Sequence, residues 1–243
     1  MRTLVILPTY NEAENVLPLA RAVMEQQDGL EVLVVDDASP GGTGDLVADA
    51  MATAPRLHLI RREAKLGLGS AYVAGFRYGL ELGYDLVVTM DADFSHPPRY
   101  LPPLLDAAAG VDLVIGSRYV HGGGIVNWPV HRRALSAFAN LYVRVLLRLP
   151  ARDCTSGFRC YRREVLERVD PAGVRASGYS FLEEMVWRVH HGGFRIGEIP
   201  IVFENRHRGV SKINRSEIFR AAWHVLVSAF RTAPPATPGR KEG

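Results

Sequence analysis

Cysteines and long apolar runs are both scarce in this chain of 243 residues. Its two cysteines, Cys154 and Cys160, are too few for a disulfide framework, and five intervening residues is not a usual zinc-ligand spacing. We interpret both as reduced and structural. No segment reaches the roughly 18 apolar residues that span a bilayer, and the N-terminal apolar run is too short for a signal peptide. Any membrane role is therefore expected at the surface or through a membrane-anchored partner protein.

A large excess of charge of one sign is also missing. The chain carries 29 Lys and Arg against 26 Asp and Glu, a net charge of +3, and no basic run is interleaved with aromatic residues. This argues against nucleic-acid binding but is compatible with anionic substrates or an anionic membrane face. No internal repeat or linker divides the chain, so we expect one domain over residues 1–232 and a disordered tail over residues 233–243.

Short apolar runs alternate with helical patterns through the first half of the chain. This alternation predicts an α/β fold with a mostly parallel sheet and helices on both faces, in which ligands bind beyond the carboxyl ends of the strands. The expected strands are Thr3–Leu7, Glu31–Val35, Leu57–Ile60, Leu86–Thr89, Leu113–Ile115, Gly157–Tyr161 and Phe194–Glu198. The expected helices are Val16–Gln26 (with Asn15 as a cap), Asp45–Ala54, Leu68–Leu82, Pro98–Ala109, Arg132–Leu149, Tyr179–His191 and Ile218–Arg231.

Two acidic pairs follow expected strands. Asp91 and Asp93 lie one residue apart in a turn, where two carboxylates can face one ion, and hard divalent cations prefer oxygen ligands. The alternative is a pair of solvated turn aspartates, because D-x-D alone is a weak motif. Asp36 and Asp37 stand where an acidic residue commonly binds ribose hydroxyls. Their alternative role is as an N-cap or Asx-turn residue that leads into the glycine-rich segment 41–44.

A second glycine-rich loop, Lys65–Ser70, follows a strand and opens a helix. Its backbone donors suit a diphosphate, although it is neither a Walker loop nor a G-x-G-x-x-G motif and can also be a plain helix start. Four basic residues stand in apolar or glycine-rich contexts. Each is either a solvated charge or a phosphate ligand, and arginine is suited to bidentate binding of phosphate. They are Arg118, Arg132, Arg206 and Lys212.

Seven segments occur in the order of one known family. They are Pro8–Glu12, Asp36–Pro40, Gly67–Tyr72, Asp91–Pro97, Gly116–Tyr119, Thr155–Arg162 and Gly193–Phe203. Through them the chain, from about residue 3 to residue 220, resembles the family-2 glycosyltransferases of GT-A fold, specifically the dolichol- or polyprenol-phosphate mannose synthases. The D-x-D turn is common to many transferases, whereas Ser156–Arg159 and Phe194–Pro200 are particular to this subgroup.

The resemblance implies transfer of mannose from GDP-mannose to a polyprenyl (dolichyl) phosphate, with Mg²⁺ or Mn²⁺ as cofactor, and we expect a single displacement with inversion. It implies catalytic roles for Asp91, Asp93 and Arg118, the first two as metal ligands with Ser95 as a further candidate where some members carry glutamine. Donor-nucleotide binding is expected at Pro8, Tyr10, Glu12, Asp37, Lys65, Gly67 and Asp91. Phosphate or acceptor binding is expected at Arg118, Arg132, Ser136, Arg206 and Lys212. Glu183 and Glu184 match a family segment but receive no role.

A phosphate monoester has a second pKa of about 6, so the acceptor oxygen is already a usable nucleophile at neutral pH. The enzyme then needs cations and alignment rather than a strong general base. The glycines of Val120–Pro129 suggest that this segment closes over the donor. The helix Ile218–Arg231 has a wide apolar face, which predicts either a helix in the membrane interface or one packed on the core.

Three other functions stay open on the sequence. A polyprenyl-phosphate glucosyltransferase using UDP-glucose would share the fold and the D-x-D turn. A phosphotransferase or hydrolase would use Asp91 as nucleophile, and a catalytically silent module would bind nucleotide sugars only. Many relatives carry transmembrane helices after the catalytic domain, whereas this sequence shows none. We therefore expect a cytoplasmic protein, peripheral on the cytoplasmic face of the membrane.

Overall fold

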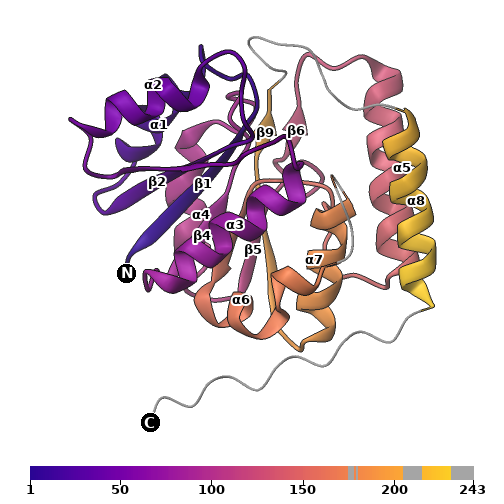
Figure 1. Ribbon diagram of the computed structural model, residues 1–243. Helices are drawn as coiled ribbons and strands as arrows, with labels where there is room; N and C mark the ends of the chain where they lie inside the picture. Colours follow the sequence, from indigo (N-terminus) through magenta and orange to yellow (C-terminus); the bar gives the residue numbers. More distant parts are fainter. Residues whose placement is uncertain (175–177, 179, 205–214, 231–243) are drawn as a thin grey trace.

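The computed structural model describes residues 1–174, 178, 180–204 and 215–230, and the side chains of 215–220 are not described. Within them, seven strands form one sheet in the order β3-β2-β1-β4-β7-β5-β8, and β6 and β9 form a second, two-stranded sheet (Figure 1). The strands are β1 Thr3–Thr9, β2 Leu30–Asp36, β3 Leu57–Arg61, β4 Leu86–Thr89, β5 Leu113–Ser117, β6 Gly124–Ile125, β7 Arg159–Arg162, β8 Ile196–Pro200 and β9 Val202–Phe203. The helices are α1 Val16–Met24, α2 Thr43–Met51, α3 Leu68–Glu81, α4 Leu101–Ala107, α5 Val130–Leu146, α6 Arg163–Val169, α7 Ser180–His191 and α8 Arg215–Ala229.

Helices cover both faces of the large sheet, as the alternating sequence pattern predicts. Leu4 and Ile6 of β1 pack in one core with residues of α3, α6 and α7. Their neighbours Val5 and Leu7 pack in the other core, with α1, α2 and α4. Alternate side chains of a strand point to opposite faces, so a strand buried on both faces is apolar at every position. Gly75 lets α3 approach β1 closely, because a Cβ there would lie 2.6 Å from Ile6 Cδ1.

Strand β7 is antiparallel to its two neighbours, and the sequence pattern did not indicate this direction. It is antiparallel to both β4 and β5, and Arg159 pairs with Thr89 of β4 and Ile115 of β5. The amino end of β7 therefore lies beside the carboxyl ends of β4 and β5. This brings the residues that precede β7, including Gly157, to the edge where ligands bind in such sheets.

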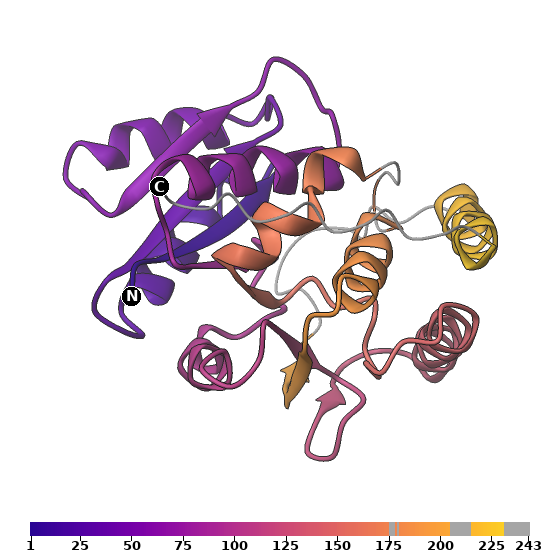
Figure 2. The same ribbon diagram turned by 90° about the horizontal axis from the view of Figure 1, so that it is seen from below.

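Helices α5 and α8 lie side by side, apart from the large sheet (Figures 1 and 2). The Tyr142 hydroxyl of α5 donates to the carbonyl of Ala222 in α8 over 3.0 Å. His224 of α8 lies 2.9 Å from a carboxylate oxygen of Glu184 in α7. The pair of helices is thus held to the domain by polar contacts as well as by packing.

The expected elements are present with shifted ends. Asn15 stands at the N-cap position of α1, as predicted, but its side chain makes no capping hydrogen bond. Its side-chain amide donates instead to Glu12 Oε2 over 3.0 Å. Helix α5 begins at Val130 rather than Arg132 and ends at Leu146, and the β6–β9 pair was not predicted. Among the described residues, no helix is long and apolar enough to cross a membrane. The expected tail, 233–243, lies outside the described residues.

Candidate active site

The acidic turn after β4 presents one accessible carboxylate and one buried one. The Asp91 side chain is 32% exposed, whereas Asp93 is buried. Asp93 Oδ1 accepts hydrogen bonds from the Ser95 amide at 3.1 Å and the Ser95 hydroxyl at 2.5 Å. Phe94 between them has a φ of 61°, so the turn is tight. The two hydrogen bonds from Ser95 therefore hold the Asp93 carboxylate in one orientation.

His96 supports the same turn, and the sequence analysis missed it. Its Nδ1 accepts the backbone N–H of Asp91 over 3.3 Å, and its ring lies against those of Phe158 and Phe203, at 5.4 and 5.2 Å. Burial lowers the pKa of His96, although Asp91 and Asp93 act in the opposite direction. Through the hydrogen bond to Nδ1, His96 holds the Asp91 backbone in place. The only sequence signal for this role was the position of His96 after the D-x-D turn.

Gly157 lies against the accessible carboxylate. A Cβ at this position would stand 3.2 Å from Asp91 Oδ1 and 3.5 Å from the Tyr72 hydroxyl oxygen. The Gly157 carbonyl accepts the Thr89 hydroxyl over 2.7 Å, which ties the segment to the end of β4. The absence of a side chain at Gly157 leaves room beside Asp91.

The expected nucleotide-binding residues come from the ends of β1 and β2 and the start of α3. Asp37 Oδ2 accepts the Gly67 amide over 2.9 Å, and Asp37 Oδ1 lies 2.8 Å from Arg62 Nε. Burial raises the pKa of Asp37 in spite of both contacts. Lys65 Nζ stands 4.0 Å from the centre of the Tyr10 ring. The structure thus brings Tyr10, Asp37, Lys65 and Gly67 to one region.

Besides Asp91, described above, two further residues were expected at the donor nucleotide, Pro8 and Glu12. Pro8 lies inside β1 and pairs in register with Val35 of β2. Glu12 Oε2 accepts the Asn15 amide, and the Glu12 backbone N–H donates to the Thr43 hydroxyl over 3.1 Å. Glu12 therefore links the loop after β1 to the start of α2.

Asp36 and Asp37 have different surroundings although they are adjacent. Asp36 Oδ1 accepts the hydroxyls of Thr9 and Ser39, at 3.0 and 2.5 Å, and Asp36 Oδ2 accepts the Ser39 amide at 3.1 Å. These contacts form a turn stabilised by an aspartate side chain. Of the two roles expected for the acidic pair, ribose binding and turn formation, Asp36 therefore has the turn role.

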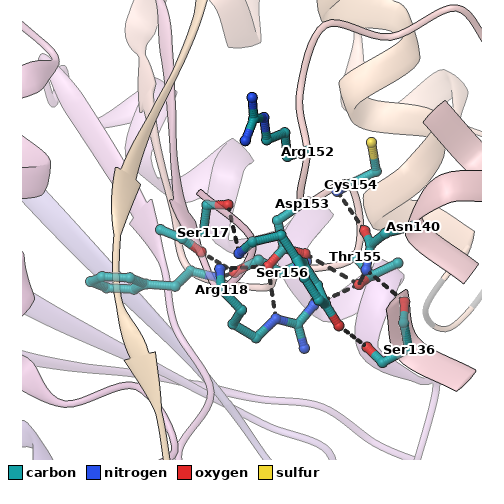
Figure 3. A network of polar contacts seen from close by, with 12 residues as sticks. Ser117, Arg118, Ser136, Asn140, Arg152, Asp153, Cys154, Thr155 and Ser156 are labelled. Atoms are coloured by element: carbon teal, nitrogen blue, oxygen red, sulfur yellow. Dashed lines mark hydrogen bonds and ion pairs between the residues drawn. The ribbon is translucent and has the colours of Figure 1, made fainter. Parts of the chain in front are cut away.

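Arg118 forms the centre of a buried polar network (Figure 3). Its Nε and Nη2 donate to the two carboxylate oxygens of Asp153, each over 2.7 Å, and Nη2 also donates to the Thr155 hydroxyl over 2.6 Å. Asp153 is fully buried. Burial alone would raise its pKa, but the Arg118 charge and hydrogen bonds lower the pKa of Asp153. This bidentate pair fixes the guanidinium plane.

Helix α5 supports the network from the side. Asn140 donates to the Thr155 hydroxyl over 3.0 Å and accepts the Cys154 amide over 2.8 Å. One turn earlier, the Ser136 hydroxyl accepts that of Tyr119 over 2.7 Å. Asp153, Thr155 and Asn140 were missed because nothing in their spacing indicates that they meet Arg118.

Aromatic rings lie between the acidic turn and the arginines. Phe203 contacts His96 and lies 5.5 Å from the Arg118 guanidinium. It also meets Trp128 edge to face at 5.4 Å, and Arg132 stacks on Trp128 at 3.8 Å. The described part of the chain thus brings together the acidic turn, Arg118, Arg132 and Ser136. Arg206 and Lys212, the other predicted phosphate ligands, lie outside the described residues.

Two curated proteins resemble the chain over almost its whole length. It is 50% identical over 226 residues to a polyprenol monophosphomannose synthase of Mycolicibacterium smegmatis, covering 92% of this chain and 85% of that protein. It is 47% identical over 229 residues to an undecaprenyl-phosphate mannosyltransferase of Micrococcus luteus, covering 93% of each.

Solved structures share the fold at lower identity. A mannosyltransferase from Pyrobaculum calidifontis, solved with GDP-Man and Mn²⁺, has a TM-score of 0.61 at 24% identity, covering 96% of this chain and 66% of that one. A glucosyl-3-phosphoglycerate synthase from Mycobacterium tuberculosis, solved with Mn²⁺ and UDP, has a TM-score of 0.63 at 19% identity, covering 94% and 78%. The predicted GT-A fold is confirmed. The model of glycosyl transferase family 2 matches residues 4–170, and the chain belongs to this family of glycosyltransferases.

Proposed function

We propose that this protein transfers mannose, with inversion, from GDP-mannose to a polyprenyl phosphate. The proposal rests on one observation, that acidic and basic side chains lie close together at one edge of the sheet. The carboxylate of Asp91 stands beside Gly157, which leaves room there, and the Arg118 guanidinium lies across Phe203 from the same turn. A reaction between two anionic phosphates requires both a divalent ion and fixed cations. The names of the two relatives at about half identity support the sugar and the acceptor.

Asp91 and Asp93 would hold Mg²⁺ or Mn²⁺. Their oxygen donors are of the type such ions prefer, and the glycine at position 157 places no side chain against Asp91 Oδ1. The described residues contain no cluster of three or more His, Cys, Asp or Glu side chains that could hold a metal. That agrees with a site completed by substrate phosphates, which is usual for Mg²⁺. The ion would supply charge neutralisation for the diphosphate leaving group.

The residues of the chain would then bind and align the substrates. Arg118 and Arg132 would attract the acceptor phosphate, together with Ser136, while Asp37 and the loop at Gly67 would bind the nucleoside side of the donor. The acceptor phosphate is largely a dianion at neutral pH, so it can attack the sugar without a strong general base. Rate enhancement would come from alignment and charge stabilisation.

Transfer of labelled sugar into organic-extractable lipid tests the proposal. Purified protein is mixed with Mg²⁺ or Mn²⁺, a polyprenyl phosphate, and either GDP-mannose or UDP-glucose. Metal-dependent label from GDP-mannose alone is the expected result. Label from UDP-glucose alone would show that the sugar is glucose and the donor UDP-glucose. Donor hydrolysis without lipid label would indicate a hydrolase. An α-linked product detected by NMR would contradict inversion.

Replacing Gly157 with alanine should lower the turnover number about tenfold, because the new Cβ would stand 3.2 Å from Asp91 Oδ1 and force the carboxylate to move by a few tenths of an ångström. The measurement is the initial rate at saturating substrates, with the melting temperature recorded alongside. Gly110→Ala is the matched control, because its Cβ would meet only the Ala107 carbonyl, at 3.8 Å. Equal activity of Gly157→Ala and Gly110→Ala would contradict this role for Gly157.

The proposed acceptor is a membrane lipid, and helix α5 has the surface for peripheral binding. Its exposed large apolar residues recur at helical spacing, at Leu135, Phe138, Leu141 and Val145. Arg133, Arg144 and Arg148 are also exposed, and the sequence contains no acidic residue between Asp112 and Asp153. An apolar stripe with basic residues and without carboxylates fits an anionic membrane face. On the neighbouring α8, Trp223 is exposed as well.

Replacing Phe138 with glutamate should reduce binding to anionic vesicles about tenfold, because a 64% exposed ring is exchanged for a carboxylate that the lipid surface repels. Vesicle flotation measures the effect. Turnover of a short, water-soluble prenyl phosphate should stay near the wild-type value. Leu46→Glu on α2 is the control. Leu46 is also exposed, but α2 packs on the opposite face of the large sheet from α5. If both variants bind vesicles like the wild type, α5 is not the membrane-binding surface.

A further inference from the structure

Arg159 is a fully buried arginine whose charge is satisfied by backbone carbonyls. It is 0% exposed. Nε donates to the Ser156 carbonyl over 2.8 Å, Nη2 to Cys154 over 2.7 Å and Nη1 to Leu182 over 2.6 Å. Among the described residues, no carboxylate oxygen lies within ion-pair distance of its guanidinium. Nη1 also donates to the Tyr161 hydroxyl over 3.3 Å. Burying a cation that has no directly paired carboxylate costs free energy. These hydrogen bonds offset that cost, together with the nearby charges of Asp153 and Glu183.

Two of those carbonyls, of Cys154 and Ser156, belong to the segment 153–157. This segment connects the Arg118 network with the acidic turn at Asp91. At one end of this segment, Asp153 holds the Arg118 guanidinium. At the other end, Gly157 lies against the Asp91 carboxylate. The third carbonyl, that of Leu182, belongs to α7 and is packed in the core. The Arg159 guanidinium therefore attaches the segment 153–157 to the body of the domain.

We infer that Arg159 is a positioning residue that fixes the segment 153–157, and through it the relative placement of Arg118 and Asp91. Arg159 contacts no substrate group and acts only through Asp153 and Gly157. The planar guanidinium can donate in three directions at once, whereas a lysine ammonium at the same position cannot reach all three carbonyls with the same geometry. The effect on transfer rests on the proposed function, but the positioning itself does not.

Arg162, at the other end of β7, offers a matched comparison. Its guanidinium also donates to three backbone carbonyls, those of Ala108, Ala109 and Val111, at 2.9, 3.1 and 3.2 Å. Arg162 pairs in register with Leu86 at the start of β4, whereas Arg159 pairs with Thr89 at its end. Arg162→Lys thus removes the same type of contact far from Asp91 and Arg118.

The test compares Arg159→Lys with Arg162→Lys in the full chain. Hydrogen exchange measured by mass spectrometry should become faster over residues 153–157 in Arg159→Lys and stay unchanged there in Arg162→Lys. Turnover of polyprenyl phosphate should fall about 100-fold in Arg159→Lys, as expected for a misplacement of about 1 Å. Affinity for GDP without metal should change less than about threefold, since the contacts of Asp37 and Gly67 are not altered. Arg162→Lys should keep near wild-type turnover.

Unchanged exchange over 153–157 in Arg159→Lys would overturn the inference. So would equal losses of turnover in both variants, because Arg159 would then act only through general stability. If Arg159→Lys and Arg159→Gln both fail to fold while Arg162→Lys folds, Arg159 belongs to the folding core and the inference is also wrong. If the wild type transfers no mannose, the proposed function fails, whereas the exchange measurement still decides the role of Arg159.

Discussion

Replacing Asp91 with asparagine is expected to lower the turnover number for sugar transfer by about 10²- to 10³-fold, the usual loss when one charge-stabilising group is removed from a transition state. Asp91 is the accessible carboxylate of the turn after β4, with its side chain 32% exposed, while Asp93 is buried and bound to Ser95. Asparagine keeps the size of the side chain but loses the charge that binds a divalent ion.

Metal titration distinguishes this loss from misfolding. Asp91→Asn should require a much higher concentration of Mn²⁺ for half-maximal activity, and its melting temperature should remain within a few degrees of the wild type. Asp45→Asn serves as the control. Asp45 lies on α2 and forms an exposed ion pair with Arg61 of β3, where the loss of a carboxylate has little energetic effect. An unchanged Mn²⁺ requirement in Asp91→Asn would remove Asp91 from the metal site.

Replacing Asp153 with asparagine should destabilise the protein by about 3–5 kcal/mol and abolish measurable transfer, because the buried Arg118 charge loses its partner. Asp153 is fully buried and accepts two side-chain hydrogen bonds from Arg118, at 2.7 Å each. Urea unfolding gives the stability, and the lipid-labelling assay gives the activity. A variant that is as stable as the wild type would show that the Arg118–Asp153 pair contributes little to folding.

The double variant Arg118→Met with Asp153→Leu separates the two effects. Replacing both members of a buried ion pair by apolar residues of similar size is often neutral or stabilising. The double variant should therefore recover most of the lost stability while remaining inactive, because it lacks the guanidinium that would meet a phosphate. Recovery of activity together with stability would show that Arg118 has only a structural role.

The same pair predicts how stability depends on pH. The Arg118 charge and hydrogen bonds outweigh burial and lower the pKa of Asp153 in the folded protein, whereas the unfolded value is about 3.9. A group with a lowered folded pKa contributes its full stability above the unfolded pKa, and the contribution is lost as the pH falls through the folded pKa. The difference in unfolding free energy between the wild type and Asp153→Asn should therefore be constant from about pH 5 to 7 and shrink below about pH 4.

Much of the fold could be predicted from local pattern. The strands buried on both faces appear as continuous apolar runs such as Leu4–Leu7 and Val32–Val35, and the helices appear as periodic segments between them. A parallel α/β sheet places its ligands at the carboxyl ends of strands, so the turns at Asp37 and Asp91 could be identified as candidate sites. Only their position in the chain was needed for that inference.

Pairings between distant side chains could not be predicted in this way. Arg118 and Asp153 are 35 residues apart and meet because β7 runs antiparallel between β4 and β5. The strand pattern of residues 157–161 is the same for either direction, because alternation of side chains does not depend on the direction of the chain. The sequence therefore indicated Arg118 as a basic residue near a phosphate but not the carboxylate that holds it.

The amino-acid sequence by itself determined the parallel strands of the sheet, the family and the acidic turn, because short-range patterns of apolar, glycine and acidic residues specify them. The antiparallel direction of β7 was decided only by the tertiary structure. The tertiary structure decided which of the two adjacent aspartates, Asp36 or Asp37, forms the turn and which faces the loop before α3. Asp36 forms a turn with Ser39, whereas Asp37 faces Gly67 and Arg62. Adjacent carboxylates are equivalent in sequence, and only the long-range packing that brings the next loop against one of them makes them different.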